Sequence, residues 1–240
     1  RINWSVTMIR GKCFILPIAL ALVLLVVAPL CDASPDEDRL LEGLLGSYNR
    51  LSRPAKKESD KVEVIHGAKI KKIKDFNSQT YLTTFELLEI IEWKDYRLKW
   101  SERDYGNIKS VRLPSEMVWL PDLKPYEGWY DRSDLTNKVV VKSDGTVKWI
   151  VPRLFSTMCG IDGPTVYCSM DIGSWTYDAT EMNLTTKEKL ATDKEIDTFQ
   201  QNFNKFIVNV RRWEKNCPDI GYNCPKPHVT LAYSLKFDKA

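Results

Sequence analysis

The segment LTTFELLEIIEWKDYRLKW, residues 82–100, belongs either to a helix or to a strand, and the class of the whole domain depends on which it is. Glu86, Glu89 and Glu92 recur at every third position, with the apolar pairs Leu87-Leu88 and Ile90-Ile91 between them. This period is closer to the roughly 3.6 residues of a helical turn than to the two of a strand. Taken alone, the pattern predicts a helix.

The sequence around this segment predicts one opening helix and otherwise β-structure. Ser34-Pro-Asp-Glu37 is typical of a capping box with proline at the first helical position. Apolar residues then follow at helical spacing as far as Leu51, and Arg53-Pro54 is predicted to end the helix. After Lys61 the chain is mostly short segments rich in valine, isoleucine, tryptophan and tyrosine, separated by turn signals.

Two hairpins are predicted in the β-rich part. Residues 139–142 and 147–150 flank a tight turn at Ser143-Asp-Gly-Thr146. Residues 203–211 and 229–237 read as two late strands on either side of NCPDIGYNCPKPH, residues 216–228. We therefore expect residues 216–228 to form a hairpin tip.

The N-terminus has the pattern of a secretory signal. Residues 1–7 are interpreted as translated leader, and residues 8–33 as a signal peptide with a basic start, an apolar middle and small residues before a cut after Ala33. A membrane helix is the alternative, but the apolar run is short for about 20 spanning residues and Pro17 interrupts it. The mature chain, residues 34–240, is expected to be secreted.

Four cysteines remain after the signal, and they fall into the close pairs Cys159/Cys168 and Cys217/Cys224. Because exported thiols oxidise, two short-loop disulfides are expected, each stabilising by roughly 2–4 kcal/mol. A zinc site made by Cys217, Cys224, His228 and Asp219 is the alternative. Its spacing matches no common zinc pattern, and the compartment does not favour it.

Composition argues against several other classes of function. The formal net charge of +3 is too small to indicate nucleic acid or an anionic membrane as partner. No stretch after the signal approaches the length of a membrane span. Only His66 and His228 are available, and no nucleophile lies in a recognisable motif, so we expect neither an enzyme nor a bound cofactor or metal.

Several blocks together resemble the extracellular domain of nicotinic acetylcholine receptors and the soluble acetylcholine-binding proteins. The resemblance covers nearly all of the mature chain and rests on these blocks: Arg39-Leu-Leu with Tyr48-Asn and Arg53-Pro, Leu82-Thr-Thr, Trp93-Lys-Asp-Tyr-Arg-Leu-Lys-Trp100, Tyr105-Gly-Asn-Ile-Lys-Ser110, Trp119-Leu-Pro-Asp122, Gly145-Thr-Val-Lys-Trp149 and Gly173-Ser-Trp-Thr-Tyr-Asp178. It implies a helix followed by an immunoglobulin-like β-sandwich of about ten strands, assembled as a ring of five with a ligand site at each subunit boundary. Residues 82–93 then become a strand, and the spacing of their glutamates a coincidence or the sign of a bulge.

The resemblance implies a principal face made of aromatic residues, whose rings attract a protonated or quaternary amine. Tyr126, seven residues after Trp119, matches the first binding loop; Trp175 matches the second; Tyr222 matches the third. His228 stands where the family has a second tyrosine. Cys217 replaces the missing neighbour of Cys224, so residues 216–228 are expected to be a disulfide-stapled lid.

The complementary face departs from the family pattern. Its usual tryptophan falls on Leu88, or on Leu87 because of one extra residue, and the other lining positions fall on Val140, Lys148 and Ile150. An inward Lys148 would repel a cation and an aliphatic wall would favour apolar surface. We therefore expect weak binding of acetylcholine or nicotine, and a preference for a bulkier amphiphile.

These features predict a secreted homopentamer that binds a small molecule. Only eight residues lie between Cys159 and Cys168, without the hydrophobic core that touches the membrane domain in channels of the family. The extracellular domain of a channel subunit is the main alternative, and a carbohydrate-binding module a lesser one. Asn183-Leu-Thr185 is a predicted glycosylation site.

Overall fold

The computed structural model describes residues 35–130, 138–186, 203–216 and 226–239. These residues form a mainly β fold with one α-helix near the N-terminus, consistent with the expected β-sandwich. There are twelve strands in the described residues, where about ten were expected. The predicted leader and signal peptide lie outside the described residues.

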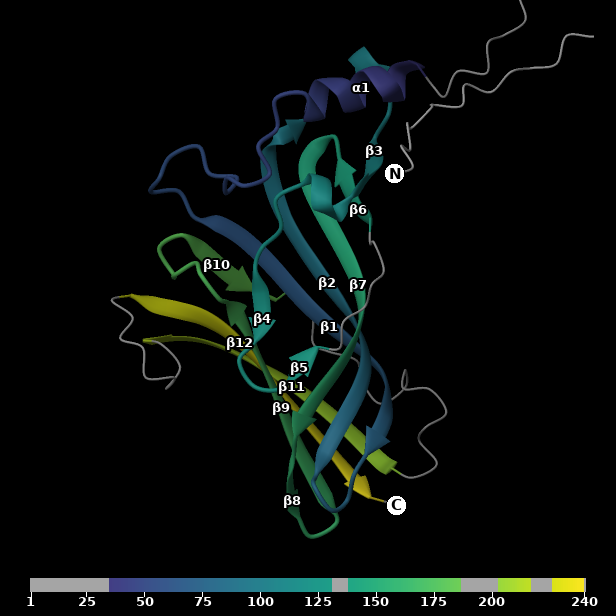
Figure 1. The fold of residues 1–240 in the computed structure, drawn as a ribbon, viewed down its shortest axis with the longest axis vertical. Helices are drawn as coiled ribbons and strands as arrows, with labels where there is room; N and C mark the ends of the chain where they lie inside the picture. The colour runs from purple at the N-terminus through teal and green to yellow at the C-terminus, as the bar shows by residue number, and fades with distance from the viewer. Residues whose placement is uncertain (1–34, 131–137, 187–202, 217–225, 240) are drawn as a thin grey trace, which may run out of the picture. The chain divides into compact units, whose positions relative to one another are not determined.

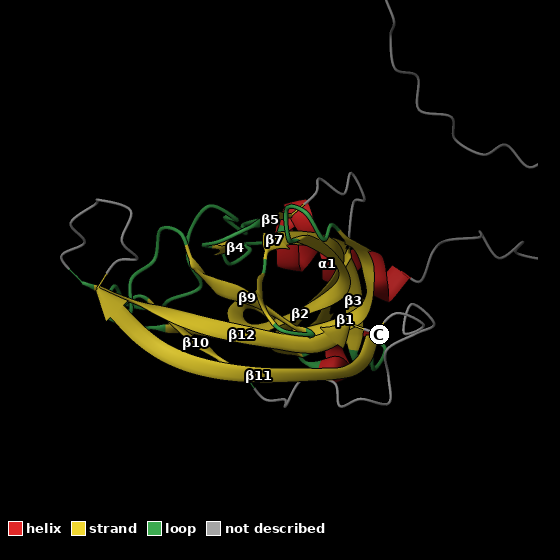
Figure 2. Ribbon diagram, turned by 90° about the horizontal axis from the view of Figure 1, so that it is seen from below, coloured by secondary structure: helices red, strands yellow, loops and turns green. Residues whose placement is uncertain are grey.

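The strands form two sheets (Figures 1 and 2). The first has the order β10-β1-β2-β7-β6-β3, with β5 also paired to β7; the second has the order β11-β12-β9-β4, with β8 also paired to β9. All pairs are antiparallel except β1 with β10. The bounds are β1 Val62–Phe76, β2 Leu82–Lys99, β3 Ser110–Pro114, β4 Leu123–Pro125, β5 Trp129–Tyr130, β6 Lys138–Lys142, β7 Asp144–Met158, β8 Gly160–Asp162, β9 Thr165–Ser174, β10 Met182–Thr185, β11 Phe203–Asn216 and β12 Pro227–Lys239.

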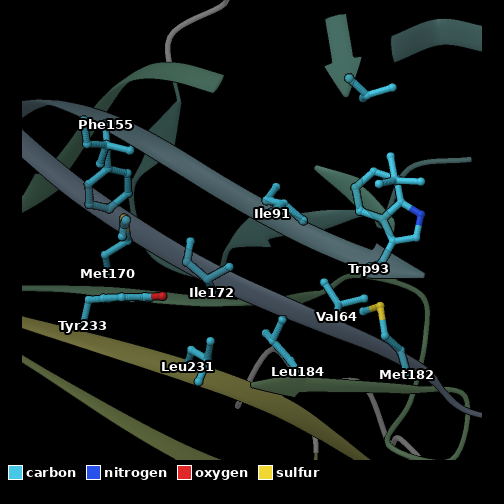
Figure 3. Packing of buried hydrophobic residues seen from close by; sticks show 14 of the residues in the cluster. Val64, Ile91, Trp93, Phe155, Met170, Ile172, Met182, Leu184, Leu231 and Tyr233 are labelled. Atoms are coloured by element: carbon cyan, nitrogen blue, oxygen red, sulfur yellow. The ribbon is translucent and has the colours of Figure 1, made fainter. Parts of the chain in front are cut away.

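The hydrophobic core lies between the two sheets (Figure 3). Ile91, Trp93 and Phe155 of the first sheet and Ile172 and Leu231 of the second belong to this core, and each is at most 2% exposed. Burying large apolar side chains in this way is the main favourable contribution to folding. Each sheet therefore has one face in the core and one face pointing outward.

Residues 82–99 form the long strand β2, so the helix predicted from the glutamate period is wrong and the strand implied by the family resemblance is correct. Burial alternates strictly from Leu82 to Trp93, which places Glu89 on the core side with Phe85 and Leu87. The pairing of β2 with β7 is regular over this stretch, so no bulge explains the spacing. The pairing of β1 with β2 is irregular at two places, between Ile70 and Lys72 and between Ile73 and Asp75. At each place β1 has one residue more than β2.

Glu89 is 1% exposed and is held by a buried polar network from four other strands. Its carboxylate accepts from Arg153 Nε at 3.0 Å and from the Tyr130 hydroxyl, and it lies 3.1 Å from His66 Nε2. The other ring nitrogen of His66 lies 2.6 Å from the Tyr233 hydroxyl. Burial alone would raise the pKa of Glu89, but the contacts with His66, Arg153 and Tyr130 outweigh it and lower the pKa below its ordinary value.

The α-helix α1, Pro35–Leu45, is shorter than predicted because it ends before Gly46 instead of continuing to Leu51. The backbone amide of Gly46 closes the last turn on the carbonyl of Glu42 at 2.9 Å. Leu40 and Leu44 are buried as the spacing predicted. The predicted capping residue Ser34 lies outside the described residues.

Both predicted hairpins are confirmed within the described part of the chain. Strand β6 pairs with β7 around the turn at residues 143–145, where Gly145 has φ +81° and a Cβ would stand 2.5 Å from the Asp95 carbonyl oxygen. Strands β11 and β12 pair as far as Asn216 and Pro227. Of the predicted tip, residues 216–228, Asn216, Pro227 and His228 belong to the paired strands, and residues 217–225 lie outside the described residues.

Candidate ligand-binding site

Tyr126 and Trp175 meet at the edge of the second sheet, where β4 pairs with the end of β9. Their ring centroids are 6.2 Å apart, with the planes inclined by 32°. The Tyr126 hydroxyl donates to the Ser174 carbonyl at 3.1 Å. The Tyr126 ring lies directly over Gly173 of β9. A Cβ at this position would stand 2.3 Å from the Tyr126 hydroxyl oxygen, so only glycine leaves room for the tyrosine side chain.

Trp175 is 50% exposed, whereas Trp93 and Trp119 are 2% and 4% exposed. Trp175 is therefore not an ordinary core tryptophan. Burial, together with the charges of Asp122 and Asp171, raises the pKa of Tyr126, so its hydroxyl stays protonated at neutral pH. The pair presents a half-exposed indole beside a neutral hydroxyl.

Asp122 holds the turn that carries Trp175. Its carboxylate accepts from the Ser174 hydroxyl at 2.5 Å and from the amide and hydroxyl of Thr176 at 2.8 and 2.7 Å. The Ser174 hydroxyl oxygen in turn accepts from the Tyr177 amide at 2.8 Å. Neither Asp122 nor Gly173 was predicted as a site residue, although both lie in the two sequence blocks that contain Trp119 and Trp175.

Replacing Asp122 with asparagine is expected to lower the free energy of unfolding by about 1–2 kcal/mol, because hydrogen bonds to a charged acceptor become weaker or are lost. Urea denaturation followed by tryptophan fluorescence measures this loss. The matched control is Asp162→Asn, an exposed carboxylate in β8, which should change stability by less than about 0.5 kcal/mol. Equal effects of the two changes would mean that Asp122 does not fix the turn.

His228 is the second residue of β12 and pairs with Lys215 of β11. Thr230 is the partner of Gly173, and extending this register to the residue that follows the end of β9 would align His228 with Trp175. The start of β12 is held against the loop between β9 and β10. The Ala179 amide donates to the Pro227 carbonyl at 2.8 Å, and Lys226 Nζ lies 3.5 Å from Asp178 Oδ2. Tyr222, Cys217 and Cys224 lie outside the described residues.

The four predicted complementary residues share the outward face of the first sheet. Strand pairing places Lys148 beside Val140 on one side and Glu92 on the other, and places Ile150 opposite Ile90. Ile150 is 45% exposed. Leu88 is on this face, whereas Leu87 is 1% exposed in the core, so the structure selects Leu88 from the two predicted positions.

The position of Lys148 changes one expectation. Glu92 is its cross-strand neighbour, and opposite charges in that position attract. The repulsion of a cation that the sequence predicted for Lys148 is therefore partly offset.

The predicted disulfide between Cys159 and Cys168 is present, with an S–S distance of 1.98 Å. It closes the short hairpin of β8 and β9. At the predicted glycosylation site, Asn183 Nδ2 donates to Glu63 at 2.7 Å and its side-chain oxygen accepts from Arg212 at 2.7 Å. The side-chain nitrogen that would carry a glycan thus donates a hydrogen bond within the protein, and glycosylation stays a prediction.

No group of three or more histidine, cysteine, aspartate or glutamate residues suited to a metal occurs in the described ranges. Three residues of the zinc alternative, Cys217, Asp219 and Cys224, lie outside those ranges. No α-helix in the part of the chain that the structure describes is long and apolar enough to span a bilayer.

Comparison with known proteins agrees with this geometry. The sequence model of the family described as "Neurotransmitter-gated ion-channel ligand binding domain" matches residues 37–239. The chain belongs to this family. The family resemblance found in the sequence is thereby confirmed.

The relatives of this chain include acetylcholine receptor subunits. Subunit non-alpha-3 of Carassius auratus is 35% identical over 208 residues, which cover 83% of this chain and 43% of the relative. Subunit alpha-2 of Homo sapiens is 37% identical over 212 residues, covering 83% and 39%. Acetylcholine receptor subunit alpha-like 2 of Drosophila melanogaster is 35% identical over 176 residues, covering 70% and 30%. The chain therefore spans less than half the length of these relatives.

Family membership fixes some of the broader expectations. The neurotransmitter-gated channel family consists of receptors, which are not enzymes. Its ligand-binding domains are extracellular, as the sequence analysis expected for this chain, and both the secreted and the plasma-membrane form of that expectation fit.

Proposed function

We propose that this domain binds a small extracellular ligand at the boundaries between subunits of a five-membered ring, as the ligand-binding part of a pentameric ligand-gated channel subunit. The observation that carries the proposal is the half-exposed Trp175, paired with Tyr126 and held by Asp122 at a sheet edge. The indole is half-exposed, and the turn that carries it is fixed by hydrogen bonds. Tyr222 and His228 complete the proposed principal face.

Two copies of the chain are needed to close the site. The Tyr126–Trp175 pair belongs to the second sheet, whereas Leu88, Val140, Lys148 and Ile150 lie on the outward face of the first. Because the core occupies the space between the sheets, that face points away from the pair within one chain. A neighbouring copy would supply the apolar wall, and burial of its exposed Ile150 would favour assembly.

The names of the relatives support a receptor subunit over the secreted homopentamer expected from the sequence, because those relatives are receptor subunits. The observation that favours the secreted ring is the disulfide loop of eight residues, closed as a short hairpin by β8 and β9. The proposal covers rings of five identical copies and rings that contain other subunits. A pentamer formed by this chain alone would support identical copies.

Native mass spectrometry of the purified protein tests the assembly. We expect a mass of five chains, and we expect Ile150→Glu to give mostly monomer, because it places a carboxylate in the apolar seam. Met158→Glu is the control, since Met158 is 63% exposed on the same strand and lies away from the proposed seam. A ring that survives Ile150→Glu while both variants remain folded would contradict this placement of the seam.

A further inference from the structure

A lysine side chain of the same chain lies beside the Trp175 indole. Lys124, in β4 opposite Gly173, is exposed and places its ammonium 5.9 Å from the centroid of the Trp175 ring. Tyr126 follows two residues later and contacts the same indole. An ammonium within about 6 Å of an indole is attracted to the ring, so Lys124 fills the role that an amine ligand would otherwise have.

Positive charge also surrounds the proposed complementary wall. Strand pairing places Arg112 and Lys148 on either side of Val140, and Lys138 and Lys142 stand two residues before and after it on the same face of β6. Arg112, Lys138 and Lys142 are exposed. Glu92 is the carboxylate paired across from Lys148, and among the described residues that flank Val140 on this face the positive charges of Arg112, Lys138, Lys142 and Lys148 outnumber it.

Two carboxylates of the turn that carries Trp175 are already engaged by the protein. Asp122 accepts three hydrogen bonds from Ser174 and Thr176, and Asp178 is paired with Lys226 at 3.5 Å. A cationic ligand at the indole would therefore meet Lys124 without gaining a free carboxylate from these two residues. An anionic group would meet an ammonium directly beside the ring.

We propose that this site takes a ligand that joins an aromatic or other apolar body to an anionic group such as a carboxylate, and that Lys124 binds the anion beside Trp175. The apolar body packs on the indole and on the aliphatic wall of Leu88, Val140 and Ile150. The cations around Val140 raise the local concentration of such anions. This inference rests on the proposed function, because it concerns the same site.

The test uses two probes that share a phenyl ring and a four-carbon chain and carry opposite charges, 4-phenylbutanoate and 4-phenylbutylamine, titrated into the assembled protein by calorimetry. We expect the acid to bind about tenfold more tightly than the amine at low ionic strength, and the ratio to shrink in high salt because exposed charges are screened. In Lys124→Gln the acid should lose about fivefold or more in affinity while the amine gains.

Lys236→Gln is the matched control. Lys236 also lies over an aromatic ring, 5.3 Å from the centroid of Tyr167, and its replacement changes the net charge equally. This variant should leave the acid-to-amine ratio within about twofold of the original.

Two results would overturn the inference, and they differ in what they say of the proposed function. If the amine binds as tightly as the acid and Trp175→Ala abolishes both, the charge preference is wrong and the site stands. If neither probe binds at millimolar concentration, or if binding persists in Trp175→Ala, the placement of the site is wrong as well.

Discussion

Replacing Glu89 with leucine is expected to lower the free energy of unfolding by about 3–5 kcal/mol, because it leaves buried partners without their acceptor. Arg153, only 21% exposed, would keep its charge with no carboxylate beside it. His66 and Tyr130 would each lose a hydrogen-bond partner in the core. Chemical denaturation at neutral pH measures the loss.

Glu86→Leu is the control for Glu89→Leu. Glu86 lies three residues away in the same strand, on the outward face, where it pairs with Lys72 at 3.3 Å with both side chains 42% exposed. A surface pair of this kind contributes about 1 kcal/mol at most. If Glu89→Leu does not fold, Glu89→Gln keeps the size of the side chain and should still cost more than Glu86→Gln. Equal costs would contradict the role given to the network.

The same network sets the direction of a pH dependence. The pKa of Glu89 in the folded protein is lowered, so its stabilisation is fully present above the pKa of a glutamate in the unfolded chain. That stabilisation is lost as the pH falls through the folded-state pKa. In Glu89→Gln the acid side of the stability profile should therefore be flatter than in the original protein.

Removing the disulfide through Cys159→Ala and Cys168→Ala together is expected to cost about 2–3 kcal/mol. The bond closes a loop of eight residues, and the constraint it puts on the unfolded chain is that of a short loop. Alanine is suitable because both sulfurs are buried, so serine would add an unpaired hydroxyl.

Reduction provides the control for the disulfide. Adding a thiol reductant should lower the unfolding midpoint of the original protein toward that of the double variant, which itself should not respond. A double variant as stable as the oxidised protein would show that the pairing of β8 with β9 is enough to hold this hairpin.

The sequence was sufficient to select Tyr126 and Trp175 together, because Trp175 lies in a recognisable block and Tyr126 follows the block at Trp119 by seven residues. It could not assign Glu89, because a glutamate in an amphipathic pattern is normally a sign of a solvent-facing position. Its partners His66 and Arg153 are 23 and 64 residues away in the chain, so no local pattern indicates them. The helix prediction for residues 82–93 failed for this reason, since Glu89 in the core imitates a helical period.

The choice between Leu87 and Leu88 depended on the same residue. Once Glu89 is known to point into the core, alternation along β2 assigns Leu87 to the core and Leu88 to the outward face.

Lys124 was missed for a different reason. A single lysine two residues before Tyr126 has no special meaning until the pairing of β4 with β9 places it near an indole.

The parallel pairing of β1 with β10 has a consequence for biosynthesis. Val62 is paired with Met182, so the first four residues of β1, 62–65, have no partner on their outer edge until at least 120 further residues (182 − 62) have been made. An uncovered strand edge invites pairing with other chains, and contacts between distant parts of a sequence form slowly. A nascent chain interrupted between these two points would therefore expose an unpaired strand edge that can associate with other chains.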